Sequence, residues 1–239
     1  MTKVIHYCWF GGKEKPELVK KCINSWIKYF PDFEIKEWNE NNFDINCNTY
    51  VQQAYNAKKY AFVADYVRFW ALEREGGLYF DTDVEVIRSF KGLLEENAFA
   101  GFETEEYIAP GLVLFVQEPN NVIIKATREW YDNTTFLDEN GEMIPHTVCT
   151  VFTDLLKKYG FQPNGKKQDC NGMVLYPMDY FNPYDDATGR LKKTENTYAI
   201  HWYAKSWIPK GKRLRSKITR IFHRIFGKDC FKKFKRKGD

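Results

Sequence analysis

Residues 60–87, YAFVADYVRFWALEREGGLYFDTDVEVI, form the stretch on which the fold of this chain depends. Its first part is predicted to form a helix, which the Gly-Gly pair at 76–77 ends, as glycines at helix C-termini commonly do. Three apolar or aromatic residues follow, a run typical of a buried strand, and the triplet Asp81-Thr82-Asp83 comes directly after them. Because side chains at i and i+2 of an extended segment point to one side, we expect Asp81 and Asp83 to face one divalent cation, directly or through water.

The helix before this strand carries two charged residues, Asp65 and Arg68. At a spacing of i and i+3 they share one face of the helix, and we expect them to point toward the acidic triplet. An Asp-x-Asp pair is a weak signal by itself, because two acids in a surface turn are usually only solvated. The buried strand and the charged pair on the helix together favour a functional site.

The chain before residue 60 predicts alternating strands and helices. Val4–Phe10 is apolar and runs into a glycine pair at 11–12, where the backbone can approach a ligand closely. A helix with apolar residues at helical spacing opens at Pro16, Phe33–Trp38 alternates like a half-buried strand, and Asn48–Lys59 is predicted to be a short helix. This order predicts a largely parallel α/β sheet with right-handed crossovers, with the acidic triplet at its carboxyl edge.

The chain after the triplet predicts shorter elements. We expect an extended segment at Val84–Ile87 and strands at Ala98–Glu103, Gly111–Val116, Met173–Tyr176 and Asp179–Phe181. Helices are predicted at Asn120–Asp132 and Thr147–Tyr159. A last apolar strand leads into His201.

Composition excludes several classes of protein. A chain of 239 residues with 44% hydrophobic content buries a proper core, so we expect one domain at 1–209 followed by a tail at 210–239. Six cysteines without a Cys-x-x-Cys pair argue against a zinc site or a disulfide framework, and we expect reduced, mostly buried thiols. No signal peptide or membrane-spanning run is visible, which predicts a cytoplasmic protein.

The tail differs from the body in charge. Residues 210–239 hold thirteen Lys or Arg against two Asp, whereas residues 1–209 are net acidic. Apolar residues recur at helical spacing within the tail, at Leu214, Ile218, Ile221, Phe222, Ile225 and Phe226. We expect a basic amphipathic helix that attaches the protein peripherally to the anionic inner face of the cell membrane. Packing of this helix on the domain stays open as an alternative, and nucleic acid is not expected as a partner because no nucleic-acid-binding module precedes the tail.

The segment 60–87, together with the first strand and its IHYCWFGG run, resembles the family 32 glycosyltransferases that carry a DxD motif, of the capsular-polysaccharide type. It is also similar to the glucosyltransferase domain of large clostridial toxins. The resemblance implies a GT-A-type nucleotide-diphospho-sugar transferase domain, with a mixed, mainly parallel sheet flanked by helices. The chain departs from the family at Ala109-Pro110-Gly111 and at Ile144-Pro145, where relatives carry a polar group and a Gly-Pro turn.

The resemblance implies a metal site for Mn²⁺ or Mg²⁺. Asp83 would hold the cation against the donor diphosphate, with Asp81 helping directly or through water. His201 is a candidate third ligand or phosphate contact, although an isolated histidine is more often a structural residue.

The resemblance also implies a donor site. Trp9 would stack on the nucleobase, Asp65 would bind ribose or sugar hydroxyls, and Arg68 would contact the sugar or the phosphates. Ser206 and Trp207 would close over the leaving diphosphate. The expected donor-binding set is Trp9, Asp65, Arg68, Asp81, Thr82, Ser206 and Trp207.

The expected reaction is transfer of a hexose with retention of configuration, from UDP-galactose, UDP-glucose or another nucleotide sugar, to a saccharide acceptor. A lipid-linked acceptor in bacterial capsular or surface polysaccharide synthesis would suit the basic tail. No residue stands out as a covalent nucleophile, which favours a same-face displacement. Two other classes stay open: a haloacid-dehalogenase-like phosphatase, whose motif needs Thr or Val where this chain has Glu85, and a non-enzymatic calcium-dependent sugar-binding or membrane-binding module.

Overall fold

The structure is a computed structural model that describes residues 2–144, 146–204 and 219–220. Its helices are α1 (Glu17–Tyr29), α2 (Thr49–Asn56), α3 (Tyr60–Glu75), α4 (Val122–Asp132), α5 (Val148–Lys157), α6 (Met178–Phe181) and a short 3₁₀ helix, η1 (Leu93–Glu95). Its strands are β1 (Val4–Cys8), β2 (Glu34–Trp38), β3 (Gly77–Tyr79), β4 (Val84–Val86), β5 (Ala98–Gly101), β6 (Leu114–Val116), β7 (Gln168–Cys170), β8 (Met173–Tyr176), β9 (Tyr184–Asp185), β10 (Arg190–Leu191) and β11 (Ala199–His201).

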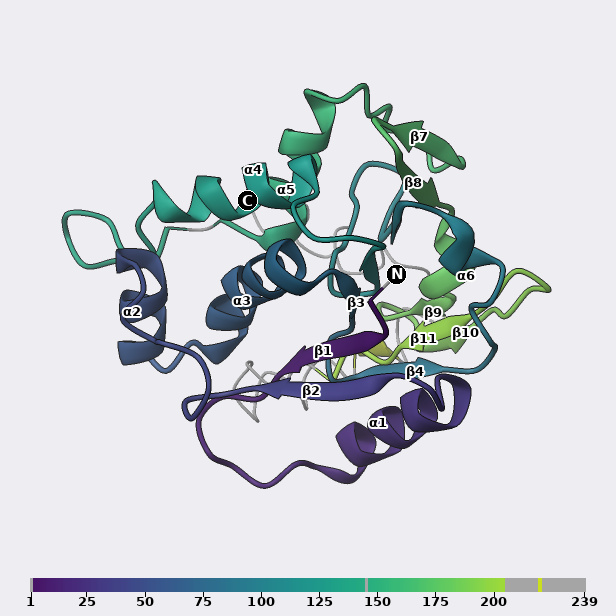
Figure 1. The fold of residues 1–239 in the computed structure, drawn as a ribbon, viewed down its shortest axis with the longest axis horizontal. Helices are drawn as coiled ribbons and strands as arrows, with labels where there is room; N and C mark the ends of the chain where they lie inside the picture. Colours follow the sequence, from purple (N-terminus) through teal and green to yellow (C-terminus); the bar gives the residue numbers. More distant parts are fainter. Residues whose placement is uncertain (1, 145, 205–218, 221–239) are drawn as a thin grey trace, which may run out of the picture.

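Seven of these strands form one central sheet in the order β2-β1-β3-β6-β5-β8-β7 (Figure 1). β1 pairs in parallel with β2 and β3, and β5 pairs in parallel with β8. β6 runs antiparallel between β3 and β5, and β7 runs antiparallel to β8. Five of the seven strands in this sheet therefore point the same way, which confirms the prediction of a mixed, mainly parallel sheet.

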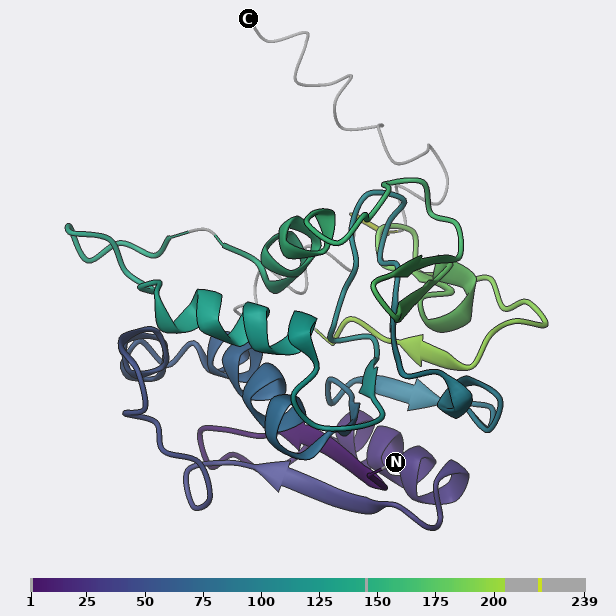
Figure 2. The same cartoon turned by 45° about the horizontal axis from the view of Figure 1, so that its top comes forward.

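The helices cover both faces of the sheet (Figures 1 and 2). Successive strand residues point to opposite faces, and β3 shows the consequence. Leu78 and Phe80 join the apolar cluster that includes Trp26 of α1, whereas Tyr79 joins the cluster that includes Val67 of α3. Apolar side chains thus cover both faces of the sheet at β3, and the acidic triplet lies just beyond the end of that strand.

A second, two-stranded sheet brings the late part of the chain to the acidic triplet. β11 pairs antiparallel with β4, which places His201 opposite Val84. The indole N–H of Trp26 donates to the Val84 carbonyl at 2.8 Å and so fixes β4 against α1. His201, predicted to lie at the end of a strand, is therefore held beside the residues that follow β3.

One predicted strand is wrong. Asp179–Phe181 forms part of the one-turn helix α6, which Pro177 precedes with a φ of −54° and which closes when the Asn182 N–H donates to the Met178 carbonyl at 2.7 Å. The short strands β7, β9 and β10 were not predicted, because two or three residues carry too little periodicity. The other predicted elements form, with ends that differ by a few residues.

The cysteines agree with the prediction of free thiols. Within the described ranges Cys8, Cys22 and Cys170 are buried, Cys149 is half-buried and Cys47 is exposed, all as free thiols. Across the same ranges, each helix falls short of the length and hydrophobicity that a membrane crossing requires. The predicted tail helix lies, but for residues 219–220, outside the described residues.

Candidate active site

The acidic triplet lies in a turn and not in an extended strand. β3 ends at Tyr79, and the Val84 N–H donates to the Asp81 carbonyl at 3.1 Å, which closes a turn over Thr82 and Asp83. The expectation that strand geometry would align the two carboxylates is therefore wrong. Their positions are set instead by the partners that each carboxylate finds in the tertiary structure.

Asp81 belongs to a network of charges with the residues of α3. Arg68 donates through Nη2 to Asp65 at 2.8 Å and to Asp81 at 3.2 Å, which confirms that Asp65 and Arg68 share a helix face. The Tyr79 hydroxyl also donates to Asp81 at 3.2 Å, and the Arg68 guanidinium lies 4.8 Å from the centre of the Tyr79 ring. Arg68 is 3% exposed, so this network is a buried clamp that bridges helix and strand.

Burial and the neighbouring charges together shift the pKa values in this clamp. Burial raises the pKa of Asp65 to about 7, although the charge of Arg68 acts in the opposite direction. Burial also acts to lower the pKa of Arg68, but Asp81, Tyr79 and Asp65 outweigh it, so that the guanidinium stays charged. Arg68 Nη1 is buried without a hydrogen-bond partner among the described residues, and such a donor is suited to a ligand oxygen.

Gly111 was not expected in the site. Its carbonyl accepts from the Asp81 N–H at 2.9 Å. A Cβ at this position would lie 2.0 Å from Asp81 Oδ2 and 3.0 Å from Arg68 Nη1. Gly111 lies in the Ala-Pro-Gly run where the chain departs from the family, and only the close packing of this loop on β3 shows why the side chain is absent.

Asp83 pairs with His201. Their side chains meet at 3.0 Å between Nε2 and Oδ1, and the Ala204 N–H donates to the other carboxylate oxygen at 2.7 Å. Burial acts to raise the pKa of Asp83, but the charge and hydrogen bond of His201 outweigh it, so the pKa lies below its ordinary value. Burial likewise acts to lower the pKa of His201, but Asp83, Asp81 and Glu103 together hold it above the ordinary value. The structure thus brings the predicted His201 to the triplet, where it forms an ion pair.

Trp9 lies beyond the carboxyl end of β1, half-buried, with its indole N–H donating to the Lys13 carbonyl at 2.6 Å. The Gly11 N–H donates to Glu40 at 2.6 Å, and a Cβ on Gly11 would lie 2.3 Å from the Tyr60 ring. The sequence did not predict these two contacts of Gly11, because they join the loop after β1 to the loop after β2 and to the start of α3, which meet only in three dimensions.

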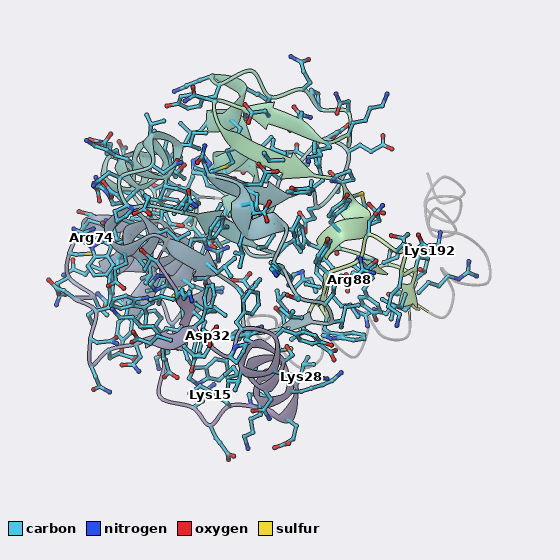
Figure 3. All side chains as sticks on the ribbon, turned by 45° about the vertical axis from the view of Figure 1, so that its right-hand side comes forward. Lys15, Lys28, Asp32, Arg74, Arg88 and Lys192 are labelled. Carbon is cyan, nitrogen blue, oxygen red and sulfur yellow. The ribbon has the colours of Figure 1, made fainter. Side chains whose placement is uncertain are left out.

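Lys15, labelled in Figure 3, lies on the loop between β1 and α1. Its ammonium group pairs with Glu37 of β2 at 2.6 Å and lies 6.0 Å from the centre of the Trp9 ring. The carboxyl ends of β1 and β2 thus combine a half-exposed indole with a charged rim, at the edge where open α/β sheets bind ligands.

The residues proposed for the metal do not form a closed site by themselves. Over residues 2–144, 146–204 and 219–220, no three His, Cys, Asp or Glu side chains are grouped so as to hold a metal ion. Thr82 lies in the turn between the two acids and is half-buried. Ser206 and Trp207, predicted to close over the diphosphate, lie outside the described residues.

Residues 16–100 match the family model described as a glycosyltransferase sugar-binding region containing a DXD motif, over just over a third of the chain. The protein is a glycosyltransferase with a DXD-type sugar-binding region. The matched stretch holds Asp65, Arg68, Asp81 and Asp83, and it favours the transferase over the phosphatase and the calcium-dependent module. A search of curated proteins found no match for the glycosyltransferase.

Two solved structures are similar to the glycosyltransferase. One, titled "PaToxG Glycosyltransferase", shares 20% identity over 65% of this chain and 68% of its own, with a TM-score of 0.47. The other, titled as a glycosyltransferase involved in the glycosylation of the major capsid of PBCV-1, shares 13% identity over 91% of this chain and 99% of its own, with a TM-score of 0.50. The second likeness bears on the fold alone, and the α/β architecture agrees with the predicted GT-A type.

Proposed function

We propose that the glycosyltransferase moves a hexose from a nucleotide sugar to a saccharide hydroxyl, with retention of configuration and with a divalent cation. UDP-hexoses such as UDP-galactose and UDP-glucose are the favoured donors, because the first strand resembles those of enzymes that use UDP. The observation that carries the proposal is the buried clamp of Asp65, Arg68 and Asp81, in which Arg68 Nη1 has no hydrogen-bond partner among the described residues.

The oxygen atoms that the site offers as metal ligands suit Mn²⁺ or Mg²⁺. Asp81 and Asp83 offer carboxylate oxygens, and Gly111 leaves the space in which an Asp81 oxygen lies. Small divalent cations are commonly held by one or two carboxylates together with substrate phosphates and water, so a closed set of three protein ligands is not required. When bound, such an ion neutralises the negative charge that develops on the diphosphate.

The remaining roles follow from charge and position. Arg68 would donate to a phosphate or sugar oxygen of the nucleotide sugar through Nη1, which has no partner in the part of the chain that the structure describes, and Asp65 would hold that guanidinium in place. Trp9 would stack on the base. In the reaction the acceptor oxygen bonds to the anomeric carbon, the bond from that carbon to the diphosphate oxygen breaks with its electron pair, and the hydroxyl proton leaves with the diphosphate.

The biological setting is a separate proposal. A lipid-linked saccharide acceptor in bacterial capsular or other surface polysaccharide synthesis is supported by the basic, amphipathic sequence of residues 210–239. Deletion of residues 212–239 is expected to abolish binding to phosphatidylserine-containing vesicles and to leave donor hydrolysis in solution intact. Equal vesicle binding by the truncated and full chains would contradict membrane attachment.

The reaction is tested by incubating the protein with UDP-glucose, UDP-galactose and GDP-mannose in the presence of Mn²⁺, and by following release of the nucleotide. Slow, metal-dependent hydrolysis is expected, and Asp83→Ala is expected to abolish it. Attack on simple phosphomonoesters would indicate a phosphatase instead. Donor binding without turnover would indicate a binding module.

A further inference from the structure

Glu103 lies where four separate segments of the chain meet. It follows β5, and its N–H donates to the Tyr107 carbonyl at 2.8 Å, which closes the base of the loop between β5 and β6. The Asn182 side chain, after α6, donates to the Glu103 carbonyl at 3.0 Å. The Tyr203 hydroxyl, after β11, donates to Glu103 Oε1 at a long 3.4 Å. Cys149 of α5 is the fourth neighbour, and burial and the charge of Glu103 raise the pKa of its thiol.

Two features of this cluster are unusual for a purely structural site. Asn182 is 7% exposed, yet its Oδ1 is buried without a partner among the described residues. An unpaired buried oxygen costs about 1–3 kcal/mol, so a native site normally supplies a donor. Tyr203 has a φ of +49°, a conformation that a side chain of this size rarely adopts. Strain of this kind is concentrated at ligand sites.

The cluster adjoins the proposed donor site. The Tyr203 ring lies 4.1 Å from the His201 ring, centre to centre, and His201 pairs with Asp83. Tyr203 therefore links Glu103, through its hydroxyl, to the pair of His201 and Asp83.

We propose that Glu103, Asn182 and Tyr203 form the subsite that binds the acceptor hydroxyl. This inference rests on the proposed transfer reaction and adds the acceptor side, which the DXD-matched residues 16–100 do not include. The carboxylate of Glu103 and Asn182 Oδ1 are hydrogen-bond acceptors. Among the described residues Asn182 Oδ1 has no donor and Glu103 Oε1 has only a long bond from Tyr203, so a sugar hydroxyl would supply the donor that this site needs. Water occupies the same place when no saccharide is present, so donor hydrolysis depends on the same residues.

The test compares Glu103→Gln with wild type in three measurements. These are hydrolysis of UDP-glucose and UDP-galactose with Mn²⁺, transfer to methyl α- and β-glycosides of glucose and galactose, and calorimetric binding of UDP with Mn²⁺. Glu103→Gln keeps the size of the side chain and removes its charge, so we expect hydrolysis to fall by roughly tenfold or more. UDP affinity should stay within about twofold of wild type, because the donor site is untouched. Glu106→Gln, an exposed neighbour on the same loop, is the matched control and should behave as wild type.

The outcomes separate this proposal from the one on which it rests. Unchanged hydrolysis in Glu103→Gln overturns the subsite, and so does a loss of UDP affinity, which would place Glu103 in the donor or metal site. Tyr203→Phe gives a second measure, since removing the phenol should weaken turnover without weakening UDP binding. Absence of hydrolysis in the wild type with every donor would overturn the proposed function itself, and the subsite with it.

Discussion

Substitution of Gly111 by alanine tests the geometry of the clamp most directly. The new Cβ would lie 2.0 Å from Asp81 Oδ2, so the carboxylate would have to move by more than about 1 Å to regain ordinary contact. The bond from Arg68 to Asp81 is already 3.2 Å long, and such a shift takes it out of hydrogen-bonding range. The φ of Gly111 lies outside the left-handed region, so the effect is steric and not a matter of backbone strain.

The size of the effect follows from the bonds that are lost. A hydrogen bond to a charged group contributes about 1.5–3 kcal/mol, and the lower end applies because the Asp81 side chain is 33% exposed and partly screened by water. We therefore expect a loss of about 1.5 kcal/mol in the free energy of unfolding, which lowers the Tm by about 3–6 °C in a chain of this length. Metal-dependent donor hydrolysis should fall by about tenfold to a hundredfold, because Asp81 no longer lies where the diphosphate is bound.

The assay combines urea unfolding with donor hydrolysis, and two further variants sharpen it. Gly92→Ala is the matched control, since a Cβ on Gly92 would have no neighbour within 4 Å and its φ of −72° suits alanine. In an Asp81→Ala background the carboxylate is gone, so the cost of Gly111→Ala should fall by about half or more. Wild-type stability and activity in Gly111→Ala would refute the described packing.

Three further predictions follow. Arg68→Lys keeps one charge but loses the planar guanidinium, whose Nη2 bridges Asp65 and Asp81 while Nε donates to the Ala64 carbonyl. It should therefore cost about 2 kcal/mol in urea unfolding and most of the donor hydrolysis, whereas the solvent-facing Arg74→Lys should cost little. His6 is neutral in the fold, because its Nδ1 accepts a hydrogen bond from the indole N–H of Trp38 and burial lowers its pKa. The free energy of unfolding should therefore fall as the pH drops below about 6.5, and His6 should account for at most about 1.4 kcal/mol of that fall per pH unit. His6→Gln should lose this part of the pH dependence, as measured by urea unfolding at several pH values. Chelation with EDTA should abolish donor hydrolysis and Mn²⁺ should restore it, while hydrolysis that survives complete chelation would contradict a metal-dependent reaction.

The sequence predicted most of the scaffold, because scaffold elements are coded by local periodicity. The apolar run of Leu78 to Phe80 predicted a buried strand, and the structure pairs it in parallel with β1. The Asp65 to Arg68 spacing predicted a shared helix face, which a 2.8 Å bond confirms. The resemblance to the glycosyltransferases, and not the local pattern, placed His201 at the site, and the structure pairs it with Asp83.

The sequence by itself determined that Asp65 and Arg68 point the same way, since spacing along one helix fixes the direction in which neighbouring side chains point. Only the tertiary structure decided how those charges pair, because Gly111 and Glu103 lie on the loop between β5 and β6, whereas Asn182 comes from a segment some seventy residues later. The turn at Thr82 and Asp83 shows the same division. Its two carboxylates are oriented by Arg68 on one helix and by His201 on a strand more than a hundred residues later, and no local pattern encodes partners at that distance.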